Sequence, residues 1–145
     1  MTTIAYRDGV MAADSRAWSG SHRDIGAKWK IRRLEDGTLL GASSSVPGGG
    51  EAAIEWYILG HPVVDHHLPE TFDLLVVKRD GAALFASDKP YLSGPLVADY
   101  FAIGTGANMA LGAMFMRATA IEAVRAACHH DTCSALPIRA LTHDA

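Results

Sequence analysis

The sequence lacks the features that mark several specialised classes of protein. It has no apolar run near the roughly 18 residues that a membrane-spanning helix requires. Its start, MTTIAYRDGV, has no basic stretch followed by an apolar one, so we expect no signal peptide. It has only two cysteines, Cys128 and Cys133, too few for a disulfide framework, and we expect both to be reduced thiols in a cytoplasmic protein. The formal net charge of −3 is not that of a typical nucleic-acid-binding protein.

What is present is the composition of one globular domain. The chain has 145 residues, of which 49% are hydrophobic and 20% charged, so disorder is not expected. A chain of this length buries about two thirds of its surface on folding. We therefore expect a single domain, 1–145, with a sizeable core.

Three Asp-Gly pairs lie between apolar runs, and this is the strongest short-range signal for a β-hairpin. They predict hairpins over 3–13, 30–40 and 73–86, with turns at Asp8-Gly9, Asp36-Gly37 and Asp80-Gly81. Three hairpins favour antiparallel sheets.

Helices are fewer. The pattern predicts a short helix over 51–59, a helix that is apolar on all sides over 107–117, and an amphipathic helix over 119–129 with Thr119 as its N-cap. One strand is expected before the two later helices and another over 137–141, while 16–27 and 61–71 read as polar loops. Antiparallel strands with grouped helices indicate an α+β layered fold.

Six segments then have to be considered together: TTIA at 2–5, GVMAADSR at 9–16, KIRRL at 30–34, LGAS at 40–43, AIGTG at 102–106 and DTCS at 131–134. In this order and spacing the chain resembles the β-type subunits of the proteasome family, including the bacterial HslV-type peptidase and proteasome-like proteins of bacteria and phages. The resemblance implies an N-terminal nucleophile (Ntn) hydrolase fold, an αββα sandwich of two antiparallel sheets between helix layers. Because 60–72 has hardly any room for a second long helix, we expect one helix layer to be thinned.

The chemistry of an N-terminal threonine can be argued without the family. Thr2 would carry a nucleophile and a base on one residue, since an α-amine with a pKa near 8 is about a tenth neutral at pH 7. That amine can take the hydroxyl proton and later return it to the leaving amine. Met1 must first be removed, and a small second residue such as Thr2 favours its removal. By itself, Thr2 would more often simply begin a strand.

A buried carboxylate requires a cation, and this requirement predicts that two further candidate site residues, Asp14 and Lys30, form a pair. Asp14 follows two alanines in a predicted strand, so partial burial is expected, and Lys30 precedes a strand that could bring it close. The resemblance implies that this lysine lies beside the threonine hydroxyl and amine, and that Asp14 orients it. Lys28 is the rival for this position, although its spacing fits the family pattern less well.

Other assignments come almost wholly from the resemblance. Gly41 corresponds to a glycine whose backbone N–H faces the scissile carbonyl oxygen. Thr105, where the family has serine, and Asp131 and Ser134 correspond to residues that hold the N-terminus. The sequence departs from the family at the polar stretch 42–45 and at Ala135, where glycine is common.

Metal, cofactor and nucleotide sites are not expected. The pairs His66-His67 and His129-His130 lack carboxylates at ligand spacing other than Asp65 and Asp131. A Gly-x-Gly at 104–106 lacks the rest of a dinucleotide fingerprint. We expect Trp29 and Trp56 to be packing residues, and Trp18 to lie in a loop that lines the substrate groove in the family.

The sequence thus predicts a threonine-type peptidase that acts on peptides or unfolded protein as a cytoplasmic homo-oligomer, with no cofactor, nucleic acid or membrane partner. Whether an ATPase unfoldase assists is left open. Two alternatives remain: a non-catalytic proteasome-like scaffold, and an Ntn amidase acting on a small molecule.

Overall fold

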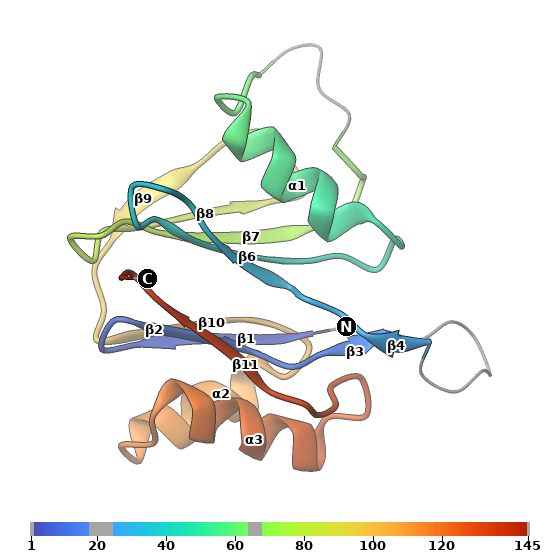
Figure 1. Cartoon of the computed structure of the whole chain (residues 1–145), viewed down its shortest axis with the longest axis vertical. Coiled ribbons are helices and arrows are strands. Elements are labelled where there is room, and N and C mark those ends of the chain that lie inside the picture. The colour runs from blue at the N-terminus through green and yellow to red at the C-terminus, as the bar shows by residue number, and fades with distance from the viewer. Residues whose placement is uncertain (1, 18–24, 64–67, 145) are drawn as a thin grey trace.

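The computed structural model describes residues 2–17, 25–63 and 68–144. Two β-sheets are stacked on each other between helices, as Figure 1 shows: α1 covers the upper sheet, and α2 and α3 lie under the lower one. This is the αββα arrangement that the resemblance implied, and the mixed α+β content with antiparallel sheets is confirmed.

The lower sheet holds the N-terminal strand between two neighbours. Its order is β10 (Tyr100–Gly104), β1 (Thr3–Arg7), β2 (Val10–Ala13) and β11 (Arg139–Thr142), with each neighbouring pair antiparallel. Because β1 is bonded on both sides, its register is fixed twice, with Ile4 opposite both Ile103 and Ala13. The pairing of β1 on both sides therefore fixes the position of Thr2, the residue that precedes this strand.

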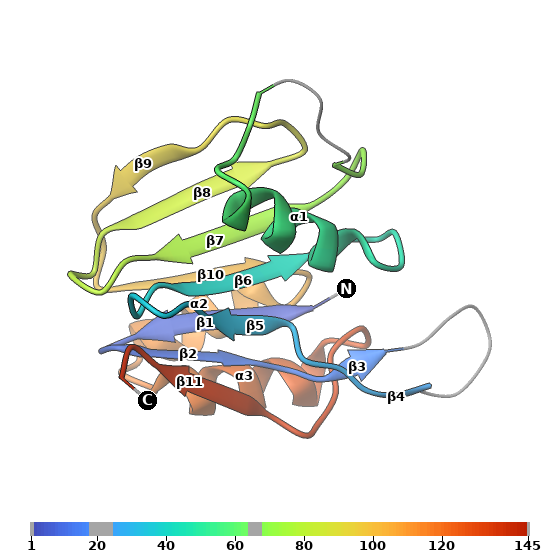
Figure 2. The same cartoon turned by 45° about the horizontal axis from the view of Figure 1, so that its top comes forward.

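The upper sheet is fully antiparallel, in the order of the chain, and spreads out in Figure 2. Its strands are β5 (Ile31–Arg33), β6 (Leu39–Ser43), β7 (Asp73–Val77), β8 (Ala83–Ser87) and β9 (Ser93–Leu96). A two-stranded ribbon of β3 (Arg16–Ala17) and β4 (Gly26–Ala27) extends from the end where the chain begins.

All three predicted hairpins are confirmed, as β1–β2, β5–β6 and β7–β8. At the first turn Asp8 and Gly9 have φ values of 50° and 79°, which is the left-handed pair that a tight hairpin turn requires.

The three predicted helices are present with small shifts in their ends. They are α1 (Gly49–Ile58), α2 (Ala107–Phe115) and α3 (Ala120–His130). Thr119 caps α3 as predicted, and Glu122 completes a capping box, since its backbone N–H donates to Thr119 while its carboxylate accepts from the Thr119 N–H. The helix predicted to begin at 51 in fact begins at Gly49.

The core lies in three layers between these elements. Ile4, Met11, Leu39 and Leu75 pack between the two sheets. A second cluster, including Leu40, Leu74 and Trp56, lies between the upper sheet and α1, and a third, including Ala5, Ala12 and Val124, between the lower sheet and α2 and α3. Neighbouring residues of one strand thus face different layers, as the pleat requires.

Some expectations were wrong. The helix over 107–117 is not buried all round: within α2 only Ala110 and Met114 are buried, while Phe115 and the following Met116 are about three quarters exposed. Trp29 is half exposed and stacks under Arg139, whereas Trp56 is a packing residue as expected. The segment 16–27, predicted as a loop, holds the short strands β3 and β4, whereas the described residues of 61–71 form no helix or strand.

Two sequence predictions concern residues outside the described ranges, namely Trp18 and the His66-His67 pair. Within the described ranges, α1 alone covers the outer face of the upper sheet. This agrees with the expectation that one helix layer is thinned. Across those same ranges, no helix is both long and apolar enough to cross a membrane.

Candidate active site

Thr2 lies at the end of β1 where three elements meet. It is only 4% exposed. Its N–H donates to Thr105 Oγ1 at 3.3 Å. Its carbonyl oxygen accepts from the N–H of Gly106 at 3.3 Å. The turn between β10 and α2 therefore holds the backbone of Thr2 on both sides.

Glycines flank Thr105 because the N-terminal segment passes against this turn. Gly104 has a φ of 97°, which L side chains rarely adopt, and a Cβ there would collide with the Thr2 carbonyl. A Cβ on Gly106 would collide with the Thr3 hydroxyl. The Gly-Thr-Gly sequence is thus explained by close backbone approach, and no phosphate site is needed to account for it.

Asp14 is the buried centre of the site. Its side chain is fully buried, and its carboxylate accepts the backbone N–H of Thr3 at 2.9 Å, of Arg16 at 3.1 Å and of Ala135 at 3.1 Å. Lys30 Nζ donates to both carboxylate oxygens, at 3.0 and 3.1 Å. One carboxylate thereby joins β1, the start of β3, the lysine before β5 and the segment before β11.

Lys30 is itself almost fully buried, with a side chain 3% exposed. Burial lowers the pKa of Lys30 more than its attraction to Asp14 raises it, so its pKa lies below that of an ordinary lysine. Lys28 differs: it pairs with Glu51 at 2.7 Å, and its side chain is 35% exposed. The structure therefore brings Lys30, and not Lys28, against Asp14.

Asp131 forms a second network on the other side of Thr2. It accepts hydrogen bonds from Thr105 Oγ1 at 2.8 Å and from Ser134 Oγ at 2.6 Å. Because the Ser134 proton is used there, the 2.7 Å bond between Thr3 and Ser134 has Thr3 as its donor. Partial burial raises the pKa of Asp131, but the hydrogen bonds from Ser134 and Thr105 outweigh it and hold the pKa below its usual value.

Thr2 and Lys30 line one cleft of about 310 Å³. The segment Ala42–Ser45, the N-terminal part of α1 with Glu51, and the side chains of Arg16 and Lys28 form its other walls. The cleft thus brings Thr2, the Lys30 cation and the segment Ala42–Ser45 together around one cavity.

Gly41 is not brought to this cleft, which corrects the role predicted for it. It lies within β6, and a Cβ there would collide with Ile4 of the facing sheet, so its small size serves close packing of the sheets. The N–H of Ala42 donates to the Lys30 carbonyl on β5. Successive N–H groups of a strand point to opposite neighbours, so that of Gly41 points toward β7. The residues after it, Ala42–Ser45, are the ones that line the cleft.

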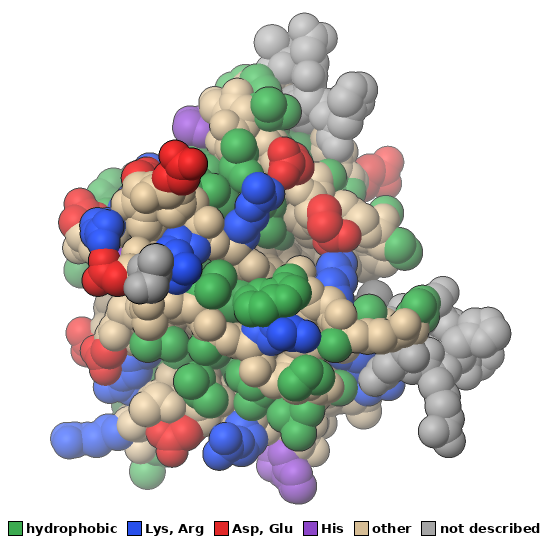
Figure 3. Space-filling model, in the orientation of Figure 1, with side chains coloured by type: hydrophobic (Ala, Val, Ile, Leu, Met, Phe, Trp, Pro, Cys, Tyr) green, Lys and Arg blue, Asp and Glu red, His purple; other side chains and the backbone are tan. Residues whose placement is uncertain are grey.

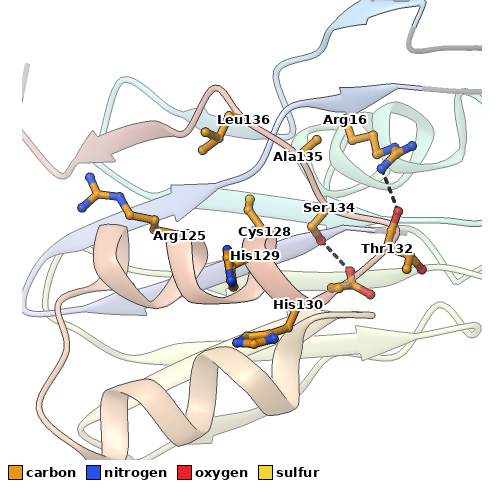
Figure 4. Close-up of a pocket in the computed structure, with 10 residues that line it drawn as sticks. Arg16, Arg125, Cys128, His129, His130, Thr132, Ser134, Ala135 and Leu136 are labelled. Carbon is orange, nitrogen blue, oxygen red and sulfur yellow. Dashed lines mark hydrogen bonds between the residues drawn. The ribbon is translucent and has the colours of Figure 1, made fainter.

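An open hollow of about 550 Å³ lies behind the Asp131 network, and Figure 4 shows its lining, including Arg16, Arg125 and the His129-His130 pair. Burial raises the pKa of Cys128, also in this lining, to about 11, so its thiol is protonated at neutral pH and is no nucleophile. No group of three or more metal-ligating side chains lies within the described parts of the chain.

Comparison with known proteins finds similar solved structures but no matching family model or curated sequence. Among solved structures, Thiobacillus denitrificans BPH in complex with epoxomicin is similar to this chain with a TM-score of 0.69 at 19% identity, over 97% of this chain and 96% of that one.

Eukaryotic HslV from Trypanosoma brucei is similar with a TM-score of 0.67 at 18% identity, and the match covers 98% of this chain and 99% of that one. BPH without the inhibitor also matches, with a TM-score of 0.66 at 20% identity, over 97% of this chain and 95% of that one. Identity at this level establishes the fold and not the activity. Over nearly its whole length, the chain has the same αββα fold as these HslV and BPH structures.

Proposed function

We propose that the protein is a threonine-type peptidase of the N-terminal nucleophile class, with Thr2 as the nucleophile once Met1 is removed. The observation that carries the proposal is the single cleft lined by Thr2 and by Lys30, whose ammonium is bonded to the buried Asp14. The similarity in fold to HslV and BPH supports the same reaction class.

In the proposed reaction Thr2 Oγ1 attacks the scissile carbonyl carbon, and the free α-amine of Thr2 accepts the hydroxyl proton. The tetrahedral intermediate collapses to an ester as the peptide C–N bond breaks, and the proton passes to the leaving amine. Water then attacks the ester, with the same amine as base, and regenerates Thr2. One residue supplies both groups, so the site needs no histidine.

Lys30 acts electrostatically. Its positive charge favours the neutral form of the Thr2 amine and stabilises the alkoxide that develops on Oγ1. Asp14 fixes the lysine and, by accepting the Thr3 N–H, also fixes the strand that carries Thr2. The Asp14 carboxylate therefore positions both the Lys30 ammonium and the strand that carries Thr2.

The second network positions the amine. Thr105 Oγ1 is the acceptor for Thr2 N, and Asp131 orients Thr105 and Ser134 by accepting from both. Since Gly41 points its N–H into the sheet and the N–H of Ala42 donates to the Lys30 carbonyl, the donor for the developing oxyanion belongs to the Ser43–Ser45 segment that lines the cleft. A donor of this kind contributes about 3 kcal/mol in acyl transfer.

The substrate class is peptides or unfolded protein, and the working form is a homo-oligomer in the cytoplasm. Self-association is supported by apolar side chains left open on α2 and beside it: Phe115 and Met116 are 75% and 77% exposed. Exposed apolar groups of this kind are typical of contact surfaces. Light scattering at micromolar concentration tests this, and a stable monomer would contradict it.

The deciding experiment combines intact mass with a covalent probe. Met1 should be absent from the purified protein, and epoxomicin, the ligand of the T. denitrificans complex, should add one equivalent of mass on the N-terminal peptide. Thr2→Ala should take up none, while Thr3→Ala, which keeps the proposed nucleophile, serves as the matched control.

If Met1 is fully retained, the isolated form cannot use this mechanism. If Thr2 is free but unlabelled, the non-catalytic scaffold is the better account. A peptide panel run beside simple amides separates the peptidase from an Ntn amidase.

A further inference from the structure

The two stacked sheets differ in width, and this leaves part of the upper sheet without a layer beneath it. Among the described residues the lower sheet has four strands and the upper sheet five. The edge strand of the lower sheet, β10, packs under β7, whereas β8 and β9 continue the upper sheet beyond β7 (Figure 2). Phe85 of β8 and Leu96 of β9 are only partly buried. A place for a further strand therefore exists beside β10 and beneath β8.

A groove of about 370 Å³ occupies this place. Phe85 and Leu96 of the upper sheet line its roof, Ala107 and Leu111 of α2 line its floor, and β10 forms its inner wall. Asp73 is the only charged residue in the described lining. The face of the molecule in Figure 3, by contrast, carries acidic and basic side chains interspersed among apolar ones. The groove is thus apolar both above and below the level of β10.

The backbone of β10 is open toward this groove. Thr3 directs both its N–H and its carbonyl oxygen to Asp14, on the β2 side of β1. Because successive residues of a strand bond to opposite neighbours, Ile4 bonds toward β10, where it lies opposite Ile103. The N–H and carbonyl groups of Ala102, the neighbour of Ile103, therefore point away from β1. No second strand pairs with β10 among the residues that the structure describes.

An extended chain that paired with Ala102 would complete both the hydrogen bonding and the packing of this region. Its side chains would point alternately up, toward Phe85 and Leu96, and down, toward Leu111. An occupant with apolar side chains on both faces therefore suits the groove. In this mode of recognition the main-chain hydrogen bonds supply affinity, and the pockets for alternate side chains supply selectivity.

The shape of the groove favours a single extended chain over a second folded copy of the protein. β10 is set back beneath β8 and β9, and α2 closes the groove from below. In two copies these projecting elements would meet before the two β10 edges came within hydrogen-bonding distance. Covering an edge strand in this way protects it from pairing with another sheet. An unfolded segment carries no such layers and can enter.

The groove is also continuous with the candidate active site. It shares Asp73 and Gly104 with a neighbouring cavity of about 360 Å³ that is also lined by Ser43–Ser45. The same three serines line the cleft that contains Thr2. A polypeptide held at Thr2 can therefore continue through the middle cavity into the groove beside β10.

We propose that the groove binds an extended apolar stretch of an unfolded polypeptide, which adds to the lower sheet as a strand beside β10 while a neighbouring stretch lies at Thr2. The inference rests on the proposed function where it takes the bound chain to be a substrate. The addition of the strand itself depends only on the groove and on the open edge of β10.

The test measures the binding of synthetic peptides to the full-length Thr2→Ala protein, so that it does not depend on turnover. The probe is a fluorescein-labelled peptide with five consecutive valine, isoleucine or leucine residues, flanked by serine and lysine for solubility. Three derivatives carry N-methyl groups on the odd residues of the apolar stretch, on its even residues, or on all five. N-methylation removes a backbone donor and leaves the side chain unchanged. Fluorescence anisotropy gives each affinity.

A strand added to one sheet edge uses the N–H groups of alternate residues only. At least one of the two alternately methylated peptides should therefore bind within about threefold of the unmethylated probe. The fully methylated peptide should bind at least about tenfold more weakly, because its hydrogen bonds to β10 are lost. Equal binding of the fully methylated peptide overturns the proposal, and so does an equal loss for all three derivatives.

Three protein variants locate the binding site. Ala102→Pro removes a donor that faces the groove but no bond to β1, since proline is tolerated on an edge strand where its nitrogen faces outward; it should weaken binding of the probe at least about fivefold. Leu96→Gln places a polar group in the roof and should weaken binding at least about threefold. Val97→Gln is the matched control, because Val97 is 96% exposed and lies outside the groove, and it should leave the affinity unchanged. Circular dichroism confirms folding.

Undiminished binding to both Ala102→Pro and Leu96→Gln overturns the proposal. If light scattering shows that Ala102→Pro dissociates an oligomer while the probe still binds, the edge belongs to a second copy and the proposal is wrong. Epoxomicin labelling of the unmutated protein reports separately on the proposed function. A protein that is labelled but does not bind the probe would therefore refute this inference alone.

Discussion

Two carboxylates hold the N-terminal segment from opposite sides, and they do it differently. Asp14 is completely buried, and its partners are three backbone N–H groups and the Lys30 ammonium. Asp131 is only partly buried, and its carboxylate accepts from the hydroxyls of Thr105 and Ser134 and from the backbone of Cys133. Asp14 thus binds a buried cation together with backbone groups, whereas two of the groups that Asp131 binds are hydroxyls that can rotate. The comparison indicates that Asp14 supports the fold and the reaction together, whereas Asp131 adjusts geometry.

The largest expected effect tests the Asp14 region. Asp14→Ala should lower the free energy of unfolding by about 3–5 kcal/mol, because it leaves the Lys30 cation buried without its carboxylate. Urea denaturation followed by circular dichroism measures this. Asp131→Ala is the control and should cost clearly less; equal losses would remove the distinction between the two regions.

The next effect concerns rate. Lys30→Ala should slow labelling of Thr2 about 10²–10³-fold, which is the size expected for loss of one preorganised electrostatic group. Lys28→Ala is matched, since it removes a lysine two residues away that pairs with Glu51 and not with Asp14. Circular dichroism confirms folding. If Lys28→Ala is the slower variant, the roles of the two lysines are reversed.

The contribution of Asp131 to the stability of the folded protein should depend on pH. Because the pKa of Asp131 is held down in the folded protein, this residue contributes stability above its unfolded pKa of about 3.9, and the contribution is lost as pH falls through the lower folded pKa. Asp131→Asn should therefore be less stable than the unmutated protein at pH 6, and the difference should shrink toward pH 3. A constant difference would mean that ionisation of Asp131 is irrelevant.

The smallest effect concerns the methyl group of Thr105. Thr105→Ser keeps the hydroxyl that accepts from Thr2 N and donates to Asp131, so labelling should change by no more than about threefold. Thr105→Val, which is close in size but lacks the hydroxyl, should slow labelling much more. Similar rates for the two variants would mean that the residue acts by shape alone.

The sequence predicted what depends on local chemistry. Asp-Gly turns between apolar runs identified three hairpins, and Thr119 with Glu122 marked the start of α3. The two-residue strands β3 and β4 were missed because their pairing depends on neighbouring segments, and β9 was missed because it contains Gly94 and Pro95.

Two further errors show the limits of a one-dimensional pattern. The apolar composition of residues 107–117 predicted a helix buried on all sides, but only the side of α2 that faces the lower sheet is covered. Gly41 was assigned by its place in a motif, although the strand pleat turns neighbouring residues to opposite sides and its space is occupied by Ile4. The pairing of Asp14 with Lys30 was predictable from charge and burial, whereas the contact between Thr3 and Ser134, 131 residues apart, was not.

The position of β1 between β10 and β2 has a consequence for local stability. The ends of most chains open first and exchange their amide hydrogens fastest. Here the amides of Thr3 to Tyr6 belong to a central strand that is buried on both faces. In a hydrogen-exchange experiment they should rank among the slowest of the chain. A reacting group at such an end would be held by the most slowly opening part of the molecule.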